Sequence, residues 1–469
     1  SPSRVLGDVY KRQDYTLHTN KDTLNISYFS YNFSILDTTI FVSTNKVLDI
    51  YLSRISVILD PVEIRRKDSI IFNLVNLRDI EGTTINSARK TEVVLISQIE
   101  GNLASNNARQ IYNKVSGLNI YQNDDAGLQL NIGGRGLDPK RSSNFNTRQN
   151  GYDISADVLG YPESYYTPPV EALEKIQIIR GASSLQYGSQ FGGLINFIMK
   201  DPKNNKQFNV LTRNTIGSNS LYTNFTSLSG NFKDLSLYSY MNYKKGDGFR
   251  DNSTFESQNI YSYISYSKER MKISSEITYL NYLSQQAGGL TDQMFNQDPL
   301  QSNRERNWFA LNWMIYNMKC HYKINNNNNL SLSIFGLNAT RDALGFRANR
   351  VSQVDPLEER DLIKGKFRNY GLESRFLHKY HLFNRRSVML IGSKLYKSNN
   401  HSEQGPGSSN SDPDFDFYLS DSPFYSNQSS YNYPNINTSI FLENIYYLSL
   451  IHISEPTRRT PISYAVFCL

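Results

Sequence analysis

The sequence predicts a mainly β protein: a transmembrane antiparallel β-barrel, incomplete and of about ten strands, preceded by an α+β domain. Three observations predict this fold. The 469 residues include 33 tyrosines at a mean hydropathy of −0.52, and tyrosine suits surfaces that meet both lipid headgroups and water. No apolar run reaches the roughly 18 residues of a transmembrane helix, so membrane insertion would have to use strands. Strand-like stretches also recur along the second half of the chain, with short and long gaps between them in turn.

The gaps between these stretches are the strongest part of the prediction. Residues 206–447 contain stretches such as LSLYSYMNY (235–243) and SVMLIGSKLY (387–396), which are typical of strands. Short turns at one rim and long loops at the other are typical of outer-membrane barrels, whereas a soluble β-sandwich is not expected to sort its loops in this way. The short gaps read NFKD, SKER, NNNNN and HLFNRR, and the long gaps are residues 284–304, 342–366 and 399–434.

Residues 91–205 are predicted to contain both strands and helices. EVVLIS (92–97) and KIQIIR (175–180) are predicted strands, and ASNNARQIYNKV (104–115) is a predicted helix with Ser105 at its N-cap. Glycine permits backbone turns and close approaches that a Cβ would forbid. The turn after the second strand contains four glycines that are predicted to serve this purpose, Gly181, Gly188, Gly192 and Gly193.

Composition argues against several function classes. The formal charge is +7, but the lysines and arginines are scattered and no nucleic-acid-binding motif accompanies them. Two cysteines exclude a disulfide scaffold, and the six histidines lack metal-ligand spacing. Neither a G-x-S-x-G motif nor paired carboxylates at a diagnostic spacing are present. We therefore expect no enzyme activity, no catalytic residues, no protein-built metal site, no resident cofactor and no nucleic-acid partner.

The two ends of the chain match one DNA element in opposite orientations. CTGTCTCTTATACACATC encodes LSLIHI (448–453), and its reverse complement encodes DVYKRQ (8–13). The match continues outward on both sides, with one mismatch at Val5. The element resembles a transposase-type sequencing adapter, and such tails are excluded from fold reasoning. We predict that residues 1–13 and 448–469 are adapter-derived tails and that the sequence between them is truncated at both ends.

Two segments precede the α+β domain. Residues 14–60 contain short alternating stretches and resemble part of a carboxypeptidase-regulatory-like β-sandwich. Residues 61–90 are polar and charged, and are predicted to be a linker that leads into the next domain.

A resemblance to a known family rests on two segments of the α+β domain. NIGGRGLDPKRSSNFNTRQNGYDIS (131–155) and YPESYYTPPVEALEKIQIIRGASSLQYGSQFGGLINFIMK (161–200) resemble the plug of TonB-dependent outer-membrane receptors, in particular the ferric-citrate and siderophore branch. The resemblance implies that residues 91–205 are a plug domain inside a barrel whose N-terminal part is residues 206–447.

The resemblance also implies site residues. Arg135 and Arg180 would form a plug–barrel lock with barrel glutamates that lie beyond the end of the chain, unless they are ordinary strand-end arginines. Asp60, Pro61, Val62, Glu63 and Ile64 lie where the family has its TonB box, although an inert linker fits this segment almost as well. Polar loops of the plug would face outward and bind an anionic chelate through guanidinium and amide donors. The expected ligand-binding residues are Arg141, Asn144, Arg148, Gln149, Tyr165 and Tyr166.

The resulting hypothesis is TonB-dependent import of ferric citrate or another siderophore across the outer membrane. Its expected partners are a TonB-type energy-transducing protein, the ferric chelate and outer-membrane lipid, with iron present only as part of the cargo. Two alternatives stay open. The same machinery could import a glycan, a peptide or a corrinoid, or the chain could be a surface adhesin.

Overall fold

The chain divides into two compact units, residues 1–68 and residues 69–469. In the first unit, β1 (Thr23–Tyr28) pairs antiparallel with β2 (Leu36–Phe41). The predicted terminal tails lie outside the described residues, as does the TonB-box-like segment. The computed structural model describes residues 23–28, 36–41, 74–75, 77–87, 91–99, 103, 107, 109, 115, 117–134, 136–158, 161–180, 185–188, 192–202, 208–383, 385–418 and 428–447.

A ten-stranded sheet forms most of the second unit, and each strand pairs antiparallel with the next one along the chain. The prediction of about ten antiparallel strands is confirmed. The strands lengthen from nine residues in β15 to 23 in β22 and β23. They are β15 (Phe208–Ile216), β16 (Tyr222–Phe232), β17 (Leu235–Gly246), β18 (Phe255–Lys268), β19 (Met271–Gln285), β20 (Trp308–Lys323), β21 (Asn328–Gly345), β22 (Arg360–Leu382), β23 (Arg385–Gly407) and β24 (Ser429–Tyr446).

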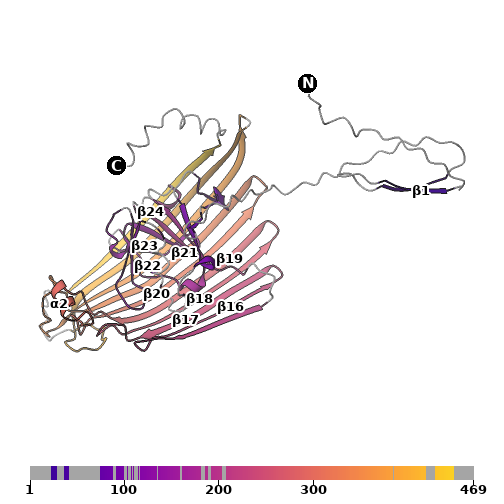
Figure 1. The fold of residues 1–469 in the computed structure, drawn as a ribbon. Coiled ribbons are helices and arrows are strands. Elements are labelled where there is room, and N and C mark those ends of the chain that lie inside the picture. Colours follow the sequence, from indigo (N-terminus) through magenta and orange to yellow (C-terminus); the bar gives the residue numbers. More distant parts are fainter. Residues whose placement is uncertain are drawn as a thin grey trace, which may run out of the picture. The chain divides into compact units, whose positions relative to one another are not determined.

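The loops of this sheet are sorted by length between its two rims. Because the strand direction alternates, the connections 286–307, 346–359 and 408–428 all lie at one rim, here called the outer rim. The connections at the opposite rim, the inner rim, are two to four residues long, as between β16 and β17 or between β20 and β21. Helix α2 (Asp292–Gln297) belongs to the first long loop and marks the outer rim in Figure 1. The predicted sorting of the loops is therefore confirmed.

The α+β domain is built on a six-stranded sheet of order β10-β9-β14-β13-β6-β3, in which only β9 and β14 run parallel. The predicted helix over 104–115 lies mostly outside the described residues. The strands of this sheet are β3 (Leu74–Val75), β6 (Thr91–Leu95), β9 (Phe145–Gln149), β10 (Tyr152–Asp153), β13 (Leu173–Arg180) and β14 (Gly193–Met199). Smaller pairs are β4 (Ile80–Glu81) with β5 (Thr84–Ile85), β7 (Leu118–Gln122) with β8 (Leu130–Gly134), and β11 (Ala156–Val158) with β12 (Tyr161–Glu163). The 3-10 helices are η1 (Ile96–Gln98), η2 (Lys140–Ser142), η3 (Val170–Ala172) and η4 (Leu185–Tyr187).

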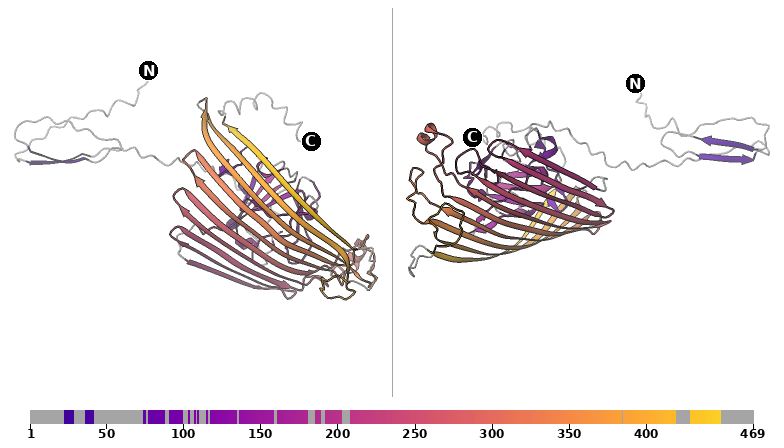
Figure 2. Two further views of the ribbon diagram at one scale, coloured as in Figure 1. Left: turned by 180° about the vertical axis from the view of Figure 1, so that it is seen from behind. Right: turned by 90° about the horizontal axis from the view of Figure 1, so that it is seen from below.

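The α+β domain packs against the concave face of the ten-stranded sheet, as the two views of Figure 2 show. One apolar cluster joins the two parts, because Phe145 and Ile176 of the domain and Tyr261 and Trp313 of the sheet are all at most 1% exposed and belong to it. Burial of apolar surface stabilises this interface at about 25 cal/mol per Å². The domain is therefore held as a plug against the wall of strands. Among the described residues, no helix is long and apolar enough to cross a membrane.

Candidate functional site

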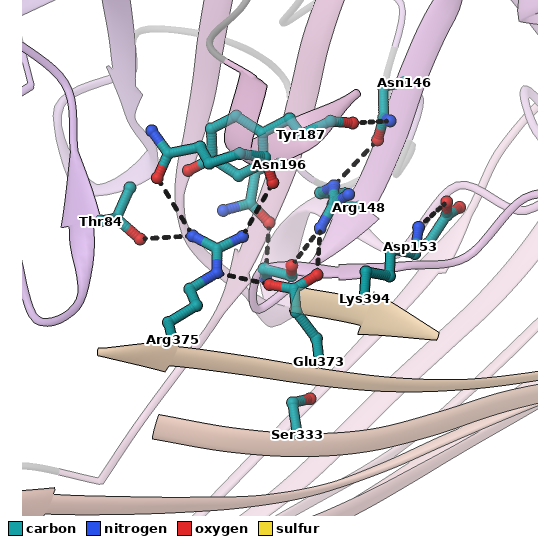
Figure 3. Close-up of polar contacts among 12 residues, drawn as sticks. Thr84, Asn146, Arg148, Asp153, Tyr187, Asn196, Ser333, Glu373, Arg375 and Lys394 are labelled. Carbon is teal, nitrogen blue, oxygen red and sulfur yellow. Dashed lines mark hydrogen bonds and ion pairs between the residues drawn. The ribbon is translucent and has the colours of Figure 1, made fainter. Parts of the chain in front are cut away.

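A buried polar cluster joins the plug to the wall (Figure 3). Arg148 on β9 of the plug is fully buried, and its guanidinium lies 3.7 Å from the carboxylate of Glu373 on β22. Arg375, two residues further along β22, donates from Nε to the same carboxylate at 2.5 Å. Both guanidinium groups face the ring of Tyr187, at 5.0 and 5.2 Å from its centroid. The cluster thus holds one carboxylate between two cations and an aromatic face.

Backbone and amide acceptors complete the cluster. Arg148 donates from Nε to the side chain of Asn146 at 2.9 Å and from NH1 to the carbonyl of Gly151 at 2.8 Å. Arg375 donates to both oxygens of Gln186, at 3.2 and 3.3 Å. A buried ion pair needs such further hydrogen bonds because desolvation of the charges is costly. This cluster is a plug–barrel lock, and its described arginines are Arg148 and Arg375.

A second polar contact lies beside the lock. Asn150 of the plug donates at 2.6 Å to Glu276 on β19, and the hydroxyl of Tyr261 on β18 donates to the same oxygen at 2.6 Å. Glu276 is 5% exposed. The expected glutamate partners of Arg135 and Arg180 stay a prediction. The glutamates that meet Arg148 and Asn150, Glu373 and Glu276, belong to described strands.

Four of the six expected ligand-binding residues are engaged within the protein. Arg148 is in the lock, and Gln149 is fully buried and donates to Tyr152 and to Thr278 on the wall. Tyr166 is 2% exposed and lies 3.5 Å from the hydroxyl of Tyr240. An external ligand cannot reach these three side chains, so their assignment as ligand-binding residues is wrong. Asn144 donates to the backbone carbonyl of Asp138 at 3.1 Å.

Tyr165 lies nearer the outer rim than the lock. Its ring packs on Phe309 and Trp313 of β20, with centroid distances of 5.7 and 5.9 Å, and the guanidinium of Arg341 lies 5.8 Å from its centroid. This side chain is partly exposed. It belongs mainly to the contact between the plug and the wall, so its ligand role stays a prediction.

Several predicted residues lie wholly or partly outside the described structure. Arg135 and Gly181 are not among the described residues, and the side chains of Arg141 and Arg180 are not described. Their predicted roles stay predictions. Of the other turn glycines, Gly188 and Gly193 have φ angles of +90° and +128°. A Cβ on Gly192 would lie 2.5 Å from the backbone oxygen of Asn144.

The outer rim contains a cavity of about 730 Å³ between the tip of the β7–β8 hairpin and the long loops. Its wall is rich in amide side chains and also contains three arginines, two aspartates and two serines. The cavity faces the rim that carries the long loops, and its volume falls within the roughly 300–1,000 Å³ of ligand sites. The polar residues that line it are Arg109, Gln122, Asn123, Asp124, Asp125, Arg250, Ser253, Ser284, Gln285, Gln286, Asn303, Arg304, Asn307 and Asn349.

The arginines of this cavity differ in their engagement. Arg250 donates to the carbonyls of Gly288 at 2.8 Å and Gln301 at 2.8 Å, and thereby holds the base of the loop 286–307. Arg304 donates to the carbonyl of Gln353 at 3.1 Å, which ties that loop to the loop 346–359. Arg109 is exposed, and none of the described residues accepts a hydrogen bond from its guanidinium. Arg109 is therefore the cation best placed to meet a ligand.

A buried carboxylate holds the plug tip in place at this cavity. Asp124 accepts hydrogen bonds from the hydroxyl of Tyr282 at 2.6 Å and from the backbone N–H groups of Leu128 and Gln129 at 3.1 and 3.0 Å. Burial raises the pKa of Asp124 above its ordinary value, against the opposing effect of these hydrogen bonds. The carboxylate thus fixes the tip to the wall.

A buried ion pair links the loops themselves. Arg306 donates to both carboxylate oxygens of Asp355, at 2.9 and 2.5 Å, and to the carbonyls of Glu358 and Ser409. The connection 286–307 is therefore fixed to the next two long loops. Burial alone would raise the pKa of Asp355, but the hydrogen bonds from Arg306 and from the N–H of Leu357 outweigh it and hold the pKa below the ordinary 3.8.

This lowered pKa predicts an acid-sensitive loop assembly. A carboxyl group whose folded pKa is depressed contributes stability that is complete above its unfolded pKa and is lost as pH falls through the folded pKa. We expect the protection factors of residues 346–359 in hydrogen exchange to be equal at pH 7 and pH 5, and to fall below about pH 3.8. Asp355→Asn should abolish this pH dependence and give low protection factors at every pH. Equal protection of the wild type at pH 7 and pH 2.5 would contradict the prediction.

The sequence analysis missed the residues that line the outer cavity and those that meet Arg148. Asp124 and Asp125 stand in a polar hairpin tip, NDDAG, which resembles any solvated turn. Glu373 and Arg375 stand two apart on a strand, so they share one face. That spacing was the available signal, because two opposite charges on the inner face of a barrel strand indicate a buried partner.

Comparison with known proteins agrees with this architecture. The model of the TonB-dependent receptor plug domain matches residues 83–194. The ferric citrate transporter FecA in its unliganded form superposes with a TM-score of 0.64 at 15% identity, over 77% of this chain and 54% of that one. P. aeruginosa FpvA bound to heterologous pyoverdines superposes with a TM-score of 0.60 at 12% identity, over 78% of this chain and 50% of that one. The copper transporter OprC superposes with a TM-score of 0.54 at 12% identity, over 80% of this chain and 54% of that one. At these identities the likeness shows the fold, and the chain spans about half the length of the matched structures.

Proposed function

We propose that this chain, a TonB-dependent outer-membrane receptor by its plug domain and barrel fold, takes part in the import of a ferric chelate. The outer cavity is the observation that supports this proposal. It lies between the plug tip and the long loops, and it is lined by amides, hydroxyls and arginines. A ferric chelate with carboxylate or hydroxamate arms carries many acceptor oxygens, and these side chains are suitable donors for them.

The transport cycle follows from the position of the plug. With the plug packed against the wall, cargo bound at the outer rim cannot pass inward until contacts such as the lock are rearranged. A TonB-type partner would supply the energy for this rearrangement, by pairing with an extended segment N-terminal to the plug. Iron enters as part of the cargo, so the protein needs neither a resident cofactor nor catalytic residues. The apolar side chains on the outer face of the strands would contact the lipid.

Binding titrations test the proposal. Ferric citrate, ferric hydroxamates, a corrinoid and a neutral oligosaccharide are added to the protein in detergent, and intrinsic fluorescence reports binding. The proposal expects saturable binding of at least one ferric chelate, and no binding of the iron-free oligosaccharide. Saturable binding of the corrinoid or the oligosaccharide alone would replace the ferric-chelate assignment with one of the alternative cargoes.

Replacement of Arg109 tests the charge of the cargo. Charge-assisted hydrogen bonds contribute about 1.5–3 kcal/mol, and Arg109 is exposed, so Arg109→Ala should weaken binding of an anionic ferric chelate about tenfold. The matched control is Arg270→Ala, which removes the same charge at an exposed position of the inner rim and should leave the affinity unchanged. Equal affinities of the wild type and Arg109→Ala for ferric citrate would exclude this contact.

A further inference from the structure

The hairpin formed by β4 and β5 bridges the plug and the wall. On the plug side, Glu81 accepts hydrogen bonds from Lys175 at 3.2 Å and from Gln177 at 3.0 Å. On the wall side, the hydroxyl of Thr83 lies 2.7 Å from that of Ser331 on β21. The hydroxyl of Thr84 accepts from Arg375 of the lock at 3.2 Å.

Two isoleucines anchor this hairpin. Ile85 is fully buried, in a small cluster that is separate from the main core, and the partly buried Ile80 packs against the same cluster. The carbonyl of Ile85 also accepts a hydrogen bond from Gln186 at 2.6 Å. The hairpin is thus attached through two isoleucines and several polar contacts, and it does not belong to the main apolar cluster. The other buried members of its cluster all come from the wall, Leu377, Val388, Leu390 and Phe441.

A cavity of about 260 Å³ lies behind the hairpin, between the plug sheet and strands β20 to β22. The hairpin segment contributes Glu81, Thr83, Thr84 and Asn86 to its lining. The wall contributes Lys319, which makes no hydrogen bond or ion pair with a described residue and is near the charges of Glu373 and Glu276. The cavity adjoins the lock, since Glu373 and Arg375 also line it. It lies nearer the inner rim than the outer cavity does, because Lys319 and Ser331 are near the inner ends of their strands.

This cavity is too small for the cargo, so one of the elements around it must move before the cargo can enter. Its volume is below the roughly 300–1,000 Å³ of small-molecule sites, whereas the outer cavity falls within that range. Of the elements around it, the wall strands are fixed by their ladders, and the plug sheet is fixed by the main core. The hairpin is the lining element that is fixed neither by a ladder of the wall nor by the main apolar cluster.

We propose that the β4–β5 hairpin is the gate of an inner passage for the cargo between the plug and strands β20 to β22. This inference rests on the proposed import function and adds the route to it. Withdrawal of the hairpin enlarges the inner cavity and removes one hydrogen-bond acceptor from Arg375. The passing chelate then meets Lys319 and Arg375, whose charges offset those of the glutamates in the same lining.

A reversible crosslink tests the gate. Thr83→Cys with Ser331→Cys places two thiols where two hydroxyls are 2.7 Å apart, in a background where Cys320 and Cys468 are serine. In the receptor extended to the full length of the matched structures, oxidation should reduce uptake of radioactive ferric chelate at least tenfold. Binding at the outer cavity should stay within twofold, and reduction should restore uptake.

The matched control crosslinks two hydroxyl positions inside the plug. Thr147 and Ser155 have their hydroxyls 2.6 Å apart, so Thr147→Cys with Ser155→Cys should transport normally when oxidised. Full uptake by the oxidised variant with cysteines at positions 83 and 331 would contradict the proposal that the hairpin is a gate. Loss of uptake in both oxidised variants also overturns it, because the plug would then have to rearrange as a whole. If the unmodified receptor binds no ferric chelate, the proposed function fails instead.

A second measurement needs no cargo. Ile85→Asp places a charge in the apolar cluster and should eject the hairpin, so a thiol introduced by Ser333→Cys in the cavity should react with a water-soluble maleimide at least ten times faster. The rate of the same thiol with Ile85 intact is the reference. An unchanged labelling rate in a folded Ile85→Asp variant would show that the hairpin does not close the cavity.

Discussion

Glu373→Ala is expected to destabilise the docked plug by about 3–5 kcal/mol, the usual result of removing one partner from a buried ion pair. The substitution leaves the guanidinium groups of Arg148 and Arg375 without their shared carboxylate in a buried site. Limited proteolysis under increasing urea should show the plug digested at a lower concentration than in the wild type, while the strands of the wall stay protected.

An exposed pair of equal length provides the control. The ammonium of Lys366 lies 3.7 Å from the carboxylate of Glu403, and these side chains are 54% and 27% exposed. The Arg148–Glu373 distance is also 3.7 Å, but those side chains are 0% and 8% exposed. Exposed pairs contribute about 0–1 kcal/mol, so Glu403→Ala should change stability little. Equal effects of the two substitutions would mean that the lock does not hold the plug.

Trp313→Ala is expected to cost about 3–5 kcal/mol, the range for removing a large buried aromatic side chain. Trp313 is fully buried between the plug and the wall, with Tyr165 and Phe367 at centroid distances of 5.9 and 6.2 Å. Its removal leaves a cavity at the centre of the shared core, so the plug and the neighbouring strands should lose stability together. Urea unfolding followed by tyrosine fluorescence measures the change.

The other tryptophan of the chain is a natural control. Trp308 lies at the outer end of the same strand and donates from Nε1 to the carbonyl of Ser411 at 2.7 Å. Trp308→Ala should cost about 1 kcal/mol, the net contribution of one hydrogen bond. If Trp313→Ala unfolds at the same urea concentration as Trp308→Ala, the plug and the wall do not share one core.

The strands and the sorting of their loops could be predicted because both depend on local sequence. A turn such as INNNNN at 324–329 and a loop as long as 286–307 differ in length whatever lies around them. Once the strands are antiparallel, their parity alone decides which rim each connection occupies. The plug could be predicted for a similar reason, since its glycine turns have strict backbone requirements that are visible in the sequence.

The depth of a side chain inside the barrel could not be predicted. A strand with one exposed face alternates between buried and exposed positions. The segment around Arg148 and Gln149 is polar throughout, so the sequence predicts an exposed loop there. In the structure all five residues of β9 are buried, because neighbouring strands, the rest of the plug and the wall enclose both faces. Some polar residues in this strand also have partners more than 100 positions away, such as Thr278 for Gln149.

The partners in the lock were also out of reach for a local argument. Glu373 reads as one of many charged residues on an alternating strand, and nothing near it in sequence indicates Arg148. Their contact depends on the register of β22 within the sheet and on how the plug sits against it. The outer cavity depends in addition on three loops that meet only in space, as the contact of Arg306 with Ser409 illustrates.

The great length of β22 and β23 determines how far from the lipid surface the outer cavity lies. A strand of 23 residues extends about 75 Å at roughly 3.3 Å per residue, and a tilt of about 40° leaves a height of roughly 55–60 Å, more than twice the apolar band of about 25 Å. The loops at the outer ends of these strands therefore stand roughly 20–30 Å above the headgroups, beyond the Debye length of about 8 Å at physiological salt. At that height any anionic solute is screened from the negative charge of the membrane surface, and its approach is governed by the field of the loops alone.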